Sequence, residues 1–367
     1  MTRTLSVEAL LERRTQANAS FFEAEAERIA LLCRELAERF VRGGRLLAVG
    51  GSPQAWSDAR HVAVEFVHPV IVGKRALPAL AVRPDELPLL VEADDATIEF
   101  EPLVVTAGER WVFEPPSDDP FVRQELCETL YHVVWELVHV FFEHLESSSA
   151  GAGASDFLYP FLSERRGGLD AVVDDVRRSV LMKAEEVAEL RAQTLTDGRD
   201  ALEAAAHAVR DAGDAGGTVL AFGNGGSATD AMDLVADLET APQGWPALRA
   251  LDLAADAAIL TALANDIGAA SLFARQVIAY GREGDVAVAL STSGNSANIV
   301  EALVEARRRG LTTIALVGYD GGRVAAEGLA DHVVVTRSEH IPRIQEAQAS
   351  AYHVLRELVE LAPPEAA

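Results

Sequence analysis

The stretch V-A-L-S-T-S-G-N-S-A-N-I-V, which covers residues 288–300, decides the fold. The apolar run 285–290 predicts a buried parallel strand, and the polar residues 291–296 predict a turn after it. A helical pattern then begins at Ala297 and continues to Arg309. Because the first backbone N–H groups of a helix have no partner inside it, such a strand, turn and helix can bind an anion.

The turn is rich in hydroxyl groups, which donate hydrogen bonds to a phosphate without adding charge. No G-x-x-x-x-G-K-[ST] sequence is present, so nothing indicates a nucleoside triphosphate site. The turn therefore favours a small phosphate monoester such as a sugar phosphate, and an ordinary capped helix start is the alternative. The candidate residues in this turn are Ser291, Thr292, Ser293 and Ser296.

Apolar strands alternate with helices along the C-terminal half, which predicts an α/β fold with a doubly wound parallel sheet flanked by helices. The region 83–117 predicts only short β pieces, at 103–106 and 110–113. The other expected strands are 45–49, 77–82, 218–222, 247–251, 286–290, 312–317 and 332–335. The other expected helices are 5–42, 58–67, 120–144, 169–212, which Asp197-Gly198 can interrupt, and 341–361.

Composition narrows the class of protein. With 367 residues the chain is long enough for two domains, and 49% hydrophobic and 24% charged residues are normal for a soluble globular protein. A net charge of −25 argues against nucleic acid, because Lys and Arg bind phosphate backbones. No run reaches the ~18 apolar residues of a membrane helix, and the N-terminus lacks the apolar core of a signal peptide. The cysteines, Cys33 and Cys127, fit core positions in a reducing compartment, so we expect a cytoplasmic protein.

Five motifs follow one another in the order and spacing of a known family. They are F-G-N-G-G-S-A-T-D-A-M at 222–232, A-N-D-I-G at 264–268, G-R-E-G-D-V at 281–286, S-T-S-G-N-S-A-N at 291–298 and R-I-Q-E at 343–346. On these motifs, residues 170–361 resemble the sugar isomerase (SIS) family, and within it the phosphoheptose isomerases. The resemblance implies interconversion of sedoheptulose 7-phosphate and D-glycero-manno-heptose 7-phosphate. In that reaction a base removes a proton beside a carbonyl, an enediol forms, and the proton returns to the neighbouring carbon.

The N-terminal half repeats part of this pattern. Gly43–Ser52 mirrors Gly216–Ser227, and Asp58–His61 mirrors Asp230–Asp233. We therefore expect two tandem SIS copies, of which the first is shortened by roughly two βα units and lacks the hydroxyl-rich turn. The expected domains are residues 1–146 and 157–367, joined by a Ser- and Gly-rich linker at 147–156.

The resemblance also implies a metal site, usually zinc. Its ligands in the family are a His and a Glu four residues apart, together with a Gln and a His of the last helix. The second half keeps Gln345 and His353 but has Asp233 and Asp237 where the His and Glu belong. The Asp pair favours a harder, weaker metal site or a plain acidic helix face. The first half keeps the whole set, which is His61, Glu65, Gln124 and His132.

Helix geometry complicates that set. Gln124 and His132 are eight residues apart, which is about 12 Å along a helix at ~1.5 Å per residue. One ion cannot easily bind both, so we expect them to serve different sites across an interface between copies. Glu65 is the candidate base or ligand, and His132 or His353 the candidate acid. The remaining substrate-binding candidates are Asn224, Ser227, Asp266 and Gln345.

Three functions compete at this stage. The first is a metal-assisted phosphoheptose isomerase acting as a homodimer, a pseudo-tetramer of SIS copies, because the family works as tetramers. The second is a non-catalytic sugar-phosphate sensor or protein partner, which the Asp233 and Asp237 changes favour. The third is an isomerase or a deaminating isomerase that acts on a hexose phosphate. Turnover of the heptose phosphate separates them.

Overall fold

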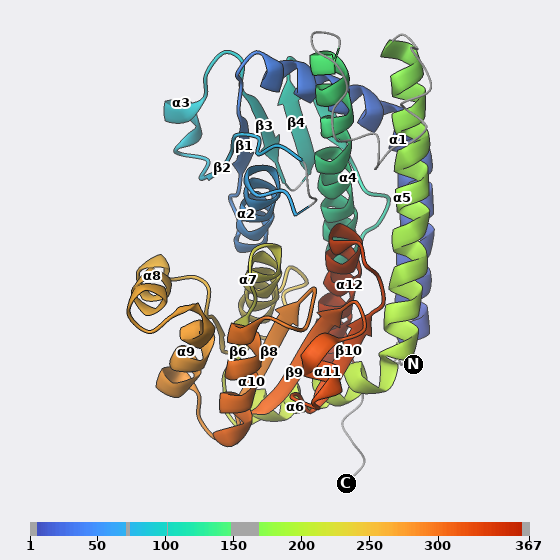
Figure 1. The fold of residues 1–367 in the computed structure, drawn as a ribbon. Coiled ribbons are helices and arrows are strands. Elements are labelled where there is room, and N and C mark those ends of the chain that lie inside the picture. The colour runs from blue at the N-terminus through green and yellow to red at the C-terminus, as the bar shows by residue number, and fades with distance from the viewer. Residues whose placement is uncertain (1–5, 71–73, 101, 148–168, 362–367) are drawn as a thin grey trace. The chain divides into compact units, whose positions relative to one another are not determined.

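The computed structural model describes residues 6–70, 74–100, 102–147 and 169–361, and the chain forms two compact units (Figure 1). The first unit consists of residues 16–186, and the second unit of residues 1–15 and 187–367.

Both divisions between the units fall inside helices, namely α1 (Val7–Val41) and α5 (Leu169–Asp197). From residue 148 onward, the expected linker 147–156 lies outside the described residues. The domain limits 1–146 and 157–367 therefore stay a prediction.

The second unit contains a five-stranded parallel sheet in the order β10-β9-β8-β6-β7. Its strands are β6 (Val219–Phe222), β7 (Ala250–Asp252), β8 (Val286–Ser291), β9 (Thr312–Gly318) and β10 (His332–Thr336). Its further helices are α6 (Arg199–Asp214), α7 (Gly226–Glu239), α8 (Ala257–Asp266), η2 (Ala269–Ser271), α9 (Leu272–Tyr280), α10 (Ala297–Arg308), α11 (Gly322–Ala326) and α12 (Ile341–Leu361).

Helices cover both faces of this sheet because its strands are apolar on both sides. Along β8, Val286, Val288 and Leu290 pack with residues of α6, α7 and α12. Ala287 and Ala289 point to the opposite face and pack with residues of α9, α10 and α11. The period of two along a fully buried strand produces the three layers of a doubly wound fold, which confirms the predicted fold class.

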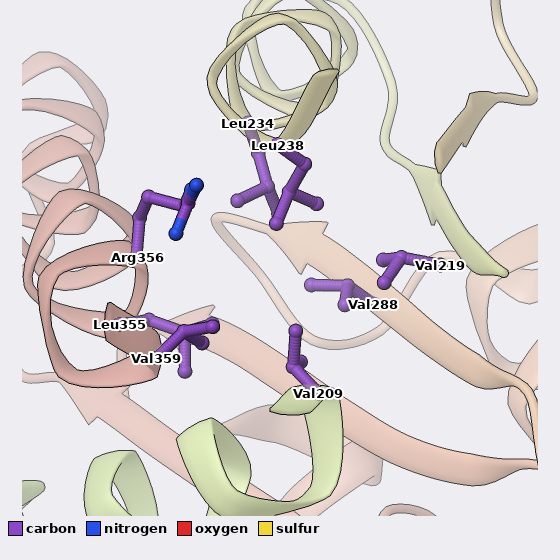
Figure 2. Close-up of a pocket in the computed structure, with 8 residues that line it drawn as sticks. All are labelled: Val209, Val219, Leu234, Leu238, Val288, Leu355, Arg356 and Val359. Atoms are coloured by element: carbon purple, nitrogen blue, oxygen red, sulfur yellow. The ribbon is translucent and has the colours of Figure 1, made fainter. Parts of the chain in front are cut away.

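Arg356 is buried where α12 meets α7, above an apolar cluster that leaves no water-sized space (Figure 2). Its Nε donates to the backbone oxygen of Asp237 at 3.0 Å, close to the C-terminus of α7. A cation at that end of a helix interacts favourably with the helix dipole. Arg356 therefore anchors α7 to α12.

The first unit contains a mixed sheet in the order β2-β1-β3-β4-β5. β1 (Leu46–Val49) is the central parallel strand between β2 (Ala79–Val82) and β3 (Ala96–Glu99). β4 (Leu103–Ala107) and β5 (Glu109–Phe113) continue the sheet antiparallel to β3. Among the described residues, the helices wholly within this unit are α2 (Pro53–Val67), α3 (Leu87–Leu90) and α4 (Pro120–Ser147).

Most elements lie where the sequence predicts them, with two differences. The helix expected at 58–67 begins earlier, because Pro53 is the first residue of α2 and the Ser52 hydroxyl accepts the Ala55 N–H at 3.0 Å. Proline suits this position because its fixed φ fits the helix and its missing N–H is not needed there. Strand β3 was not predicted from the region 83–117.

Cys33 and Cys127 are both free, as expected. Cys33 is fully buried in the core of the first unit, and this burial raises the pKa of its thiol. Within the described residues, no helix has both the length and the apolarity that a membrane crossing needs.

One carboxylate in each unit fixes the start of the central strand. In the first unit, Asp95 accepts the backbone N–H of Arg45 at 2.8 Å and that of Glu92 at 2.9 Å. In the second unit, Asp285 accepts the N–H groups of Thr218 and Arg282, both at 2.8 Å. The two aspartates precede β3 and β8, the strands that pair with the central strands β1 and β6. In both units, therefore, a carboxylate at the start of the neighbouring strand fixes the start of the central strand.

The Arg45 guanidinium also donates to both carboxylate oxygens of Asp95. Burial raises the pKa of Asp95, but the bonds from the Arg45 side chain and from the two backbone N–H groups outweigh it, so the pKa is lowered. A carboxyl with a lowered pKa stabilises the fold above the pKa of the unfolded chain, ~3.9, and this contribution disappears as the pH falls below that value.

We predict that Asp95→Asn lowers the free energy of unfolding by about 1–3 kcal/mol at pH 7, because an amide cannot accept all these donors. The difference from wild type should shrink below pH ~4. Urea unfolding across this pH range measures both effects. Asp94→Asn is the matched control, since its side chain is 54% exposed. Equal stability of the two variants at pH 7 would contradict the prediction.

Candidate active site

The hydroxyl-rich turn lies between β8 and α10 in the second unit, as predicted. Its bend depends on Gly294, which has a φ of +60°, and whose Cβ, if present, would lie 2.2 Å from the backbone oxygen of Gly321. The N–H of Gly294 donates to the Ser291 hydroxyl at 3.1 Å. The side chain of Ser296, the N-cap residue of α10, accepts no capping bond from that helix. The turn is therefore held by its own bonds, without a side-chain cap from Ser296.

A second loop lies beside this turn. It connects β6 to α7, and Gly225 in it has a φ of +58°. The side-chain amides of Asn224 and Asn298 bond reciprocally, with nitrogen-to-oxygen distances of 3.0 and 2.8 Å. Asn298 lies on α10, so this pair joins the loop after β6 to the helix after β8. Asn298 was not among the predicted residues, although it stands inside the S-T-S-G-N-S-A-N motif.

These loops follow the carboxyl ends of two neighbouring strands, β6 and β8. The strand order reverses between them, because β7 lies outside β6 and β9 outside β8. In open α/β sheets, ligands bind in the crevice at such a switch point. Six predicted residues lie at these two strand ends. Ser291 is the last residue of β8, and the others belong to the two loops or to the start of α7, namely Thr292, Ser293, Ser296, Asn224 and Ser227.

Two other predicted substrate residues lie elsewhere in the second unit. Asp266 is exposed at the last position of α8 and accepts a bond from the Asn265 amide at 2.7 Å. Within the described residues, no hydrogen bond joins Asp266 to either loop. Gln345 is buried on α12, two turns before His353. Their part in binding stays a proposal.

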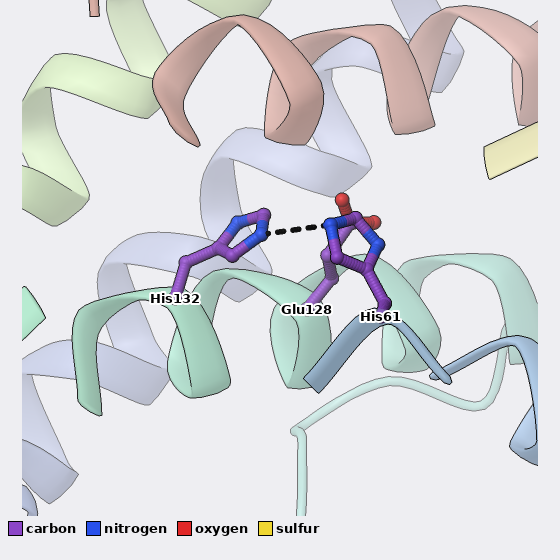
Figure 3. A group of neighbouring side chains, drawn as sticks. All are labelled: His61, Glu128 and His132. Atoms are coloured by element: carbon purple, nitrogen blue, oxygen red, sulfur yellow. Dashed lines mark hydrogen bonds between the residues drawn. The ribbon is translucent and has the colours of Figure 1, made fainter. Parts of the chain in front are cut away.

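The first unit brings His61, Glu128 and His132 together (Figure 3). His61 projects from α2, and the other two project from α4. Nε2 of His61 lies 3.2 Å from Nε2 of His132. All three side chains are buried, and one donor atom from each lies within 4.8 Å of the others. We call this group the first cluster.

The first cluster only partly matches the predicted ligand set. Glu65 lies one turn after His61 on α2, and its Oε1 is 3.9 Å from Nε2 of His61. Gln124 is half-buried on α4, two turns before His132. Glu128 stands between them, one turn before His132, and is the carboxylate that the structure groups with the histidines. The i, i+4 spacing of Glu128 and His132 was a signal that could have identified it.

The geometry of the first cluster fits a zinc ion. Two nitrogens on one tetrahedral ion, with Zn–N bonds of about 2.0–2.1 Å, lie about 3.3 Å apart. The two Nε2 atoms are 3.2 Å apart in the structure. Two histidines and one glutamate are also a known donor set for zinc. The arrangement leaves further positions for Glu65 or for a substrate oxygen.

The second unit has a corresponding group, which we call the second cluster. It contains Asp233 and Asp237 of α7 and His353 of α12, all buried. Nε2 of His353 lies 3.4 Å from Oδ2 of Asp233 and 3.3 Å from Oδ2 of Asp237. Each cluster therefore combines the helix that follows a central strand with the last helix of its sequence repeat.

His139 is a second buried histidine of α4 and belongs to neither cluster. Its Nδ1 and Nε2 lie 2.8 and 3.0 Å from the backbone oxygens of Trp135 and Arg75. Burial, with a smaller contribution from the charge of Lys74, lowers its pKa to about 4. Because both contacts are to the protein backbone, His139 has a structural role.

Comparison with known proteins identifies the family. Residues 184–318 match the model of the SIS domain. The chain is 40% identical over 214 residues to a phosphoheptose isomerase of Pelodictyon phaeoclathratiforme, a match that covers 57% of this chain and 95% of the relative. It is 44% identical over 177 residues to a phosphoheptose isomerase of Chlorobaculum tepidum, covering 47% of this chain and 84% of the relative.

The fold as a whole also has a solved counterpart. The C-terminal domain of glucosamine-fructose-6-phosphate aminotransferase from Francisella tularensis aligns with 96% of this chain, at a TM-score of 0.57 and 10% identity. At that identity the likeness concerns the fold alone. With 40% identity over 95% of a relative's length, and with the SIS-domain match between α5 and β9, this chain belongs to the SIS-domain family of phosphoheptose isomerases.

Proposed function

We propose that this aldose–ketose isomerase interconverts sedoheptulose 7-phosphate and D-glycero-manno-heptose 7-phosphate through an enediol. The observation that carries the proposal is the pair of loops at the switch point of the second sheet, joined by Asn224 and Asn298. The neutral donors of these loops and the N-terminus of α10 suit the phosphate of a sugar.

The phosphate end of the substrate is assigned to the turn. Backbone N–H groups at the start of α10 and the hydroxyls of Thr292, Ser293 and Ser296 would donate to its oxygens. Ser291 is buried and already accepts the Gly294 N–H, so it positions the turn. Asn224 and Ser227 would hold sugar hydroxyls from the neighbouring loop. Anchoring the remote phosphate holds the reacting carbons in place for proton transfer.

Proton transfer requires a base and an acid. We assign the base to Glu65 and the acid to His132 or His353. In the sequence repeat, Glu65 matches Asp237 and His132 matches His353. Glu65 Oε1 lies 3.9 Å from Nε2 of His61, and Asp237 Oδ2 lies 3.3 Å from Nε2 of His353. A zinc ion bound by His61, Glu128 and His132, with Glu65 as a further ligand, would polarise the carbonyl or the adjacent hydroxyl oxygens.

We also propose that the two units are a tandem pair of SIS copies. Several features of the structure support this. Both central strands are opened by an aspartate at the start of the neighbouring strand. Both are followed by a helix that carries cluster residues. The first unit differs after β3, where the hairpin β4–β5 replaces the turn, α10 and two parallel strands.

Ser293→Ala should reduce kcat/KM for the heptose phosphate by about 10-fold or more, since one hydrogen bond to a charged group contributes roughly 1.5–3 kcal/mol. KM should carry most of the change, and inhibition by inorganic phosphate should weaken in parallel. Steady-state kinetics measures both. Ser271→Ala removes a hydroxyl of the same unit outside the turn and should leave them unchanged. Unaltered kinetics of Ser293→Ala would refute the phosphate assignment, and binding without any turnover in wild type would favour the sensor function.

The first cluster gives a prediction about zinc content. Glu128→Gln and His132→Ala should each weaken zinc binding at least 10-fold, whereas Gln124→Ala should weaken it less. Equilibrium dialysis followed by elemental analysis provides the measurement, independently of activity. His68→Ala is the matched control, because His68 caps the same helix as His61 but is exposed. Full zinc retention by Glu128→Gln would remove Glu128 from the ligand set.

The oligomeric state is a further proposal, a homodimer of the two-unit chain. Apolar residues on the outer helices of the second unit support an interface, since Ile267 is 54% and Val304 50% exposed beside a groove between α9 and α10. Such patches often mark protein contacts. Light scattering should give twice the 39.2 kDa mass of the chain. A monomeric mass at micromolar concentration would refute the dimer.

A further inference from the structure

A third loop of the second unit packs directly against the hydroxyl-rich turn. It covers residues 318–323, which follow β9 and lead into α11, and we call it the backing loop. A Cβ on Gly318 would lie 2.3 Å from the backbone oxygen of Thr292, and a Cβ on Gly322 would lie 2.3 Å from that of Ser293. Only residues without a side chain fit so close to another backbone. The two backbones are therefore in direct contact.

The backing loop has a defined shape of its own. Tyr319 has a φ of +52°, and among the described residues it is the one non-glycine residue with a positive φ. A bulky residue keeps this conformation only where the surrounding structure imposes it. The N–H of Gly321 donates to the Gly318 oxygen at 2.9 Å, and the N–H of Val324 donates to the oxygen of Gly294 in the turn at 3.1 Å. The backing loop is thus fixed and is bonded to the turn.

The side chain of Asn295 connects the turn to the backing loop. Its Nδ2 donates to the backbone oxygen of Ser293 at 2.9 Å, and its Oδ1 accepts the backbone N–H of Arg323 at 3.0 Å. A side-chain amide offers one donor end and one acceptor end, and here each end meets the matching group. Asn295 itself is exposed. Its contribution therefore comes from these bonds and not from filling the core.

Ser293 is held by Asn295 at two points. Besides the Nδ2 bond to its backbone oxygen, the N–H of Asn295 donates to the Ser293 Oγ at 3.2 Å. A hydroxyl that accepts one bond still has its hydrogen available to donate. Both the peptide group and the hydroxyl of Ser293 are thus oriented before any ligand arrives. A donor that is already in position loses little conformational freedom when an anion binds.

We propose that Asn295 is a positioning residue of the phosphate site, which acts through Ser293 and does not itself contact the phosphate. This inference rests on the proposed function, because the phosphate in question is that of the sugar substrate. Without the amide, the turn keeps the bend at Gly294, but Ser293 loses the bonds that orient it. The loss should therefore appear in the affinity for phosphate and not in the proton-transfer step.

The test compares variants of the full-length chain. Asn295→Ala should raise KM for the heptose phosphate and the inhibition constant of inorganic phosphate by the same factor, about 3- to 10-fold, with kcat nearly unchanged. Asn295→Asp should weaken phosphate binding further, because its second carboxylate oxygen would face the Ser293 oxygen and its charge would repel the anion. Calorimetric titration with inorganic phosphate measures the binding without turnover.

Glu327→Gln is the matched control. Glu327 is exposed and bonds the Arg323 side chain at 2.7 Å, so this variant alters the same neighbour but leaves the N–H that Asn295 accepts. It should bind phosphate like wild type.

Three outcomes would overturn the proposal. Asn295→Ala could bind inorganic phosphate as tightly as wild type, or it could lower kcat while KM and the inhibition constant stay unchanged. Glu327→Gln could weaken phosphate binding as much as Asn295→Ala, which would indicate a general loosening of α11. The isomerase function is tested separately, since its failure would appear as wild type that binds phosphate without turning over the heptose phosphate, and the calorimetric comparison would still decide the role of Asn295.

Discussion

In each unit, a buried carboxylate just before one strand fixes the start of the neighbouring central strand. Asp95 and Asp285 each accept two backbone N–H groups, one of which opens the central strand of the sheet. With the start of β1 or β6 fixed and only four residues in each strand, the position of its carboxyl end follows. The loop and the helix after that end then have little freedom. His61 of the first cluster and the two aspartates of the second lie on these helices. The register of each sheet therefore determines where these side chains lie.

The two units share this path but diverge after it. In the second unit, β8 leads into the turn that Gly294 closes, and α10 supplies Asn298 to the loop after β6. In the first unit, β3 leads directly into an antiparallel hairpin, so no helix start follows it. Both units nevertheless keep a buried cluster between the helix after the central strand and the last helix of the repeat. The hydroxyl-rich turn and the buried cluster are therefore separable features of this fold, because the first unit has a cluster without the turn.

The sequence predicted what depends on local pattern. The fully apolar run of β8, the hydroxyl-rich turn and the break of the long helix at Gly198 were all legible from periodicity and from turn residues. The start of α2 at Pro53 was not predicted, because a proline after Gly-Gly-Ser is as typical of a helix breaker as of the first residue of a helix. Glu128 was missed for a different reason. The family spacing pointed to Gln124, whereas the helical repeat places the carboxylate one turn from His132 on the side that faces His61. Asn298 required knowledge of which loops are neighbours, which only the strand order provides.

The two clusters differ both in their donor groups and in the contacts around them. Asp233 and Asp237 differ from His61 and Glu65 in donor type, yet all four side chains are buried and polar. Burying a charged group is costly unless it has a partner, so the contacts around each cluster matter. Tyr352 in the second unit bonds a cluster aspartate, whereas Tyr131, which also precedes the cluster histidine, bonds Asp58. The tyrosine before the cluster histidine therefore orients a cluster carboxylate in the second unit and a neighbouring carboxylate of α2 in the first, so the two clusters are supported in different ways although they occupy matching positions of the repeat.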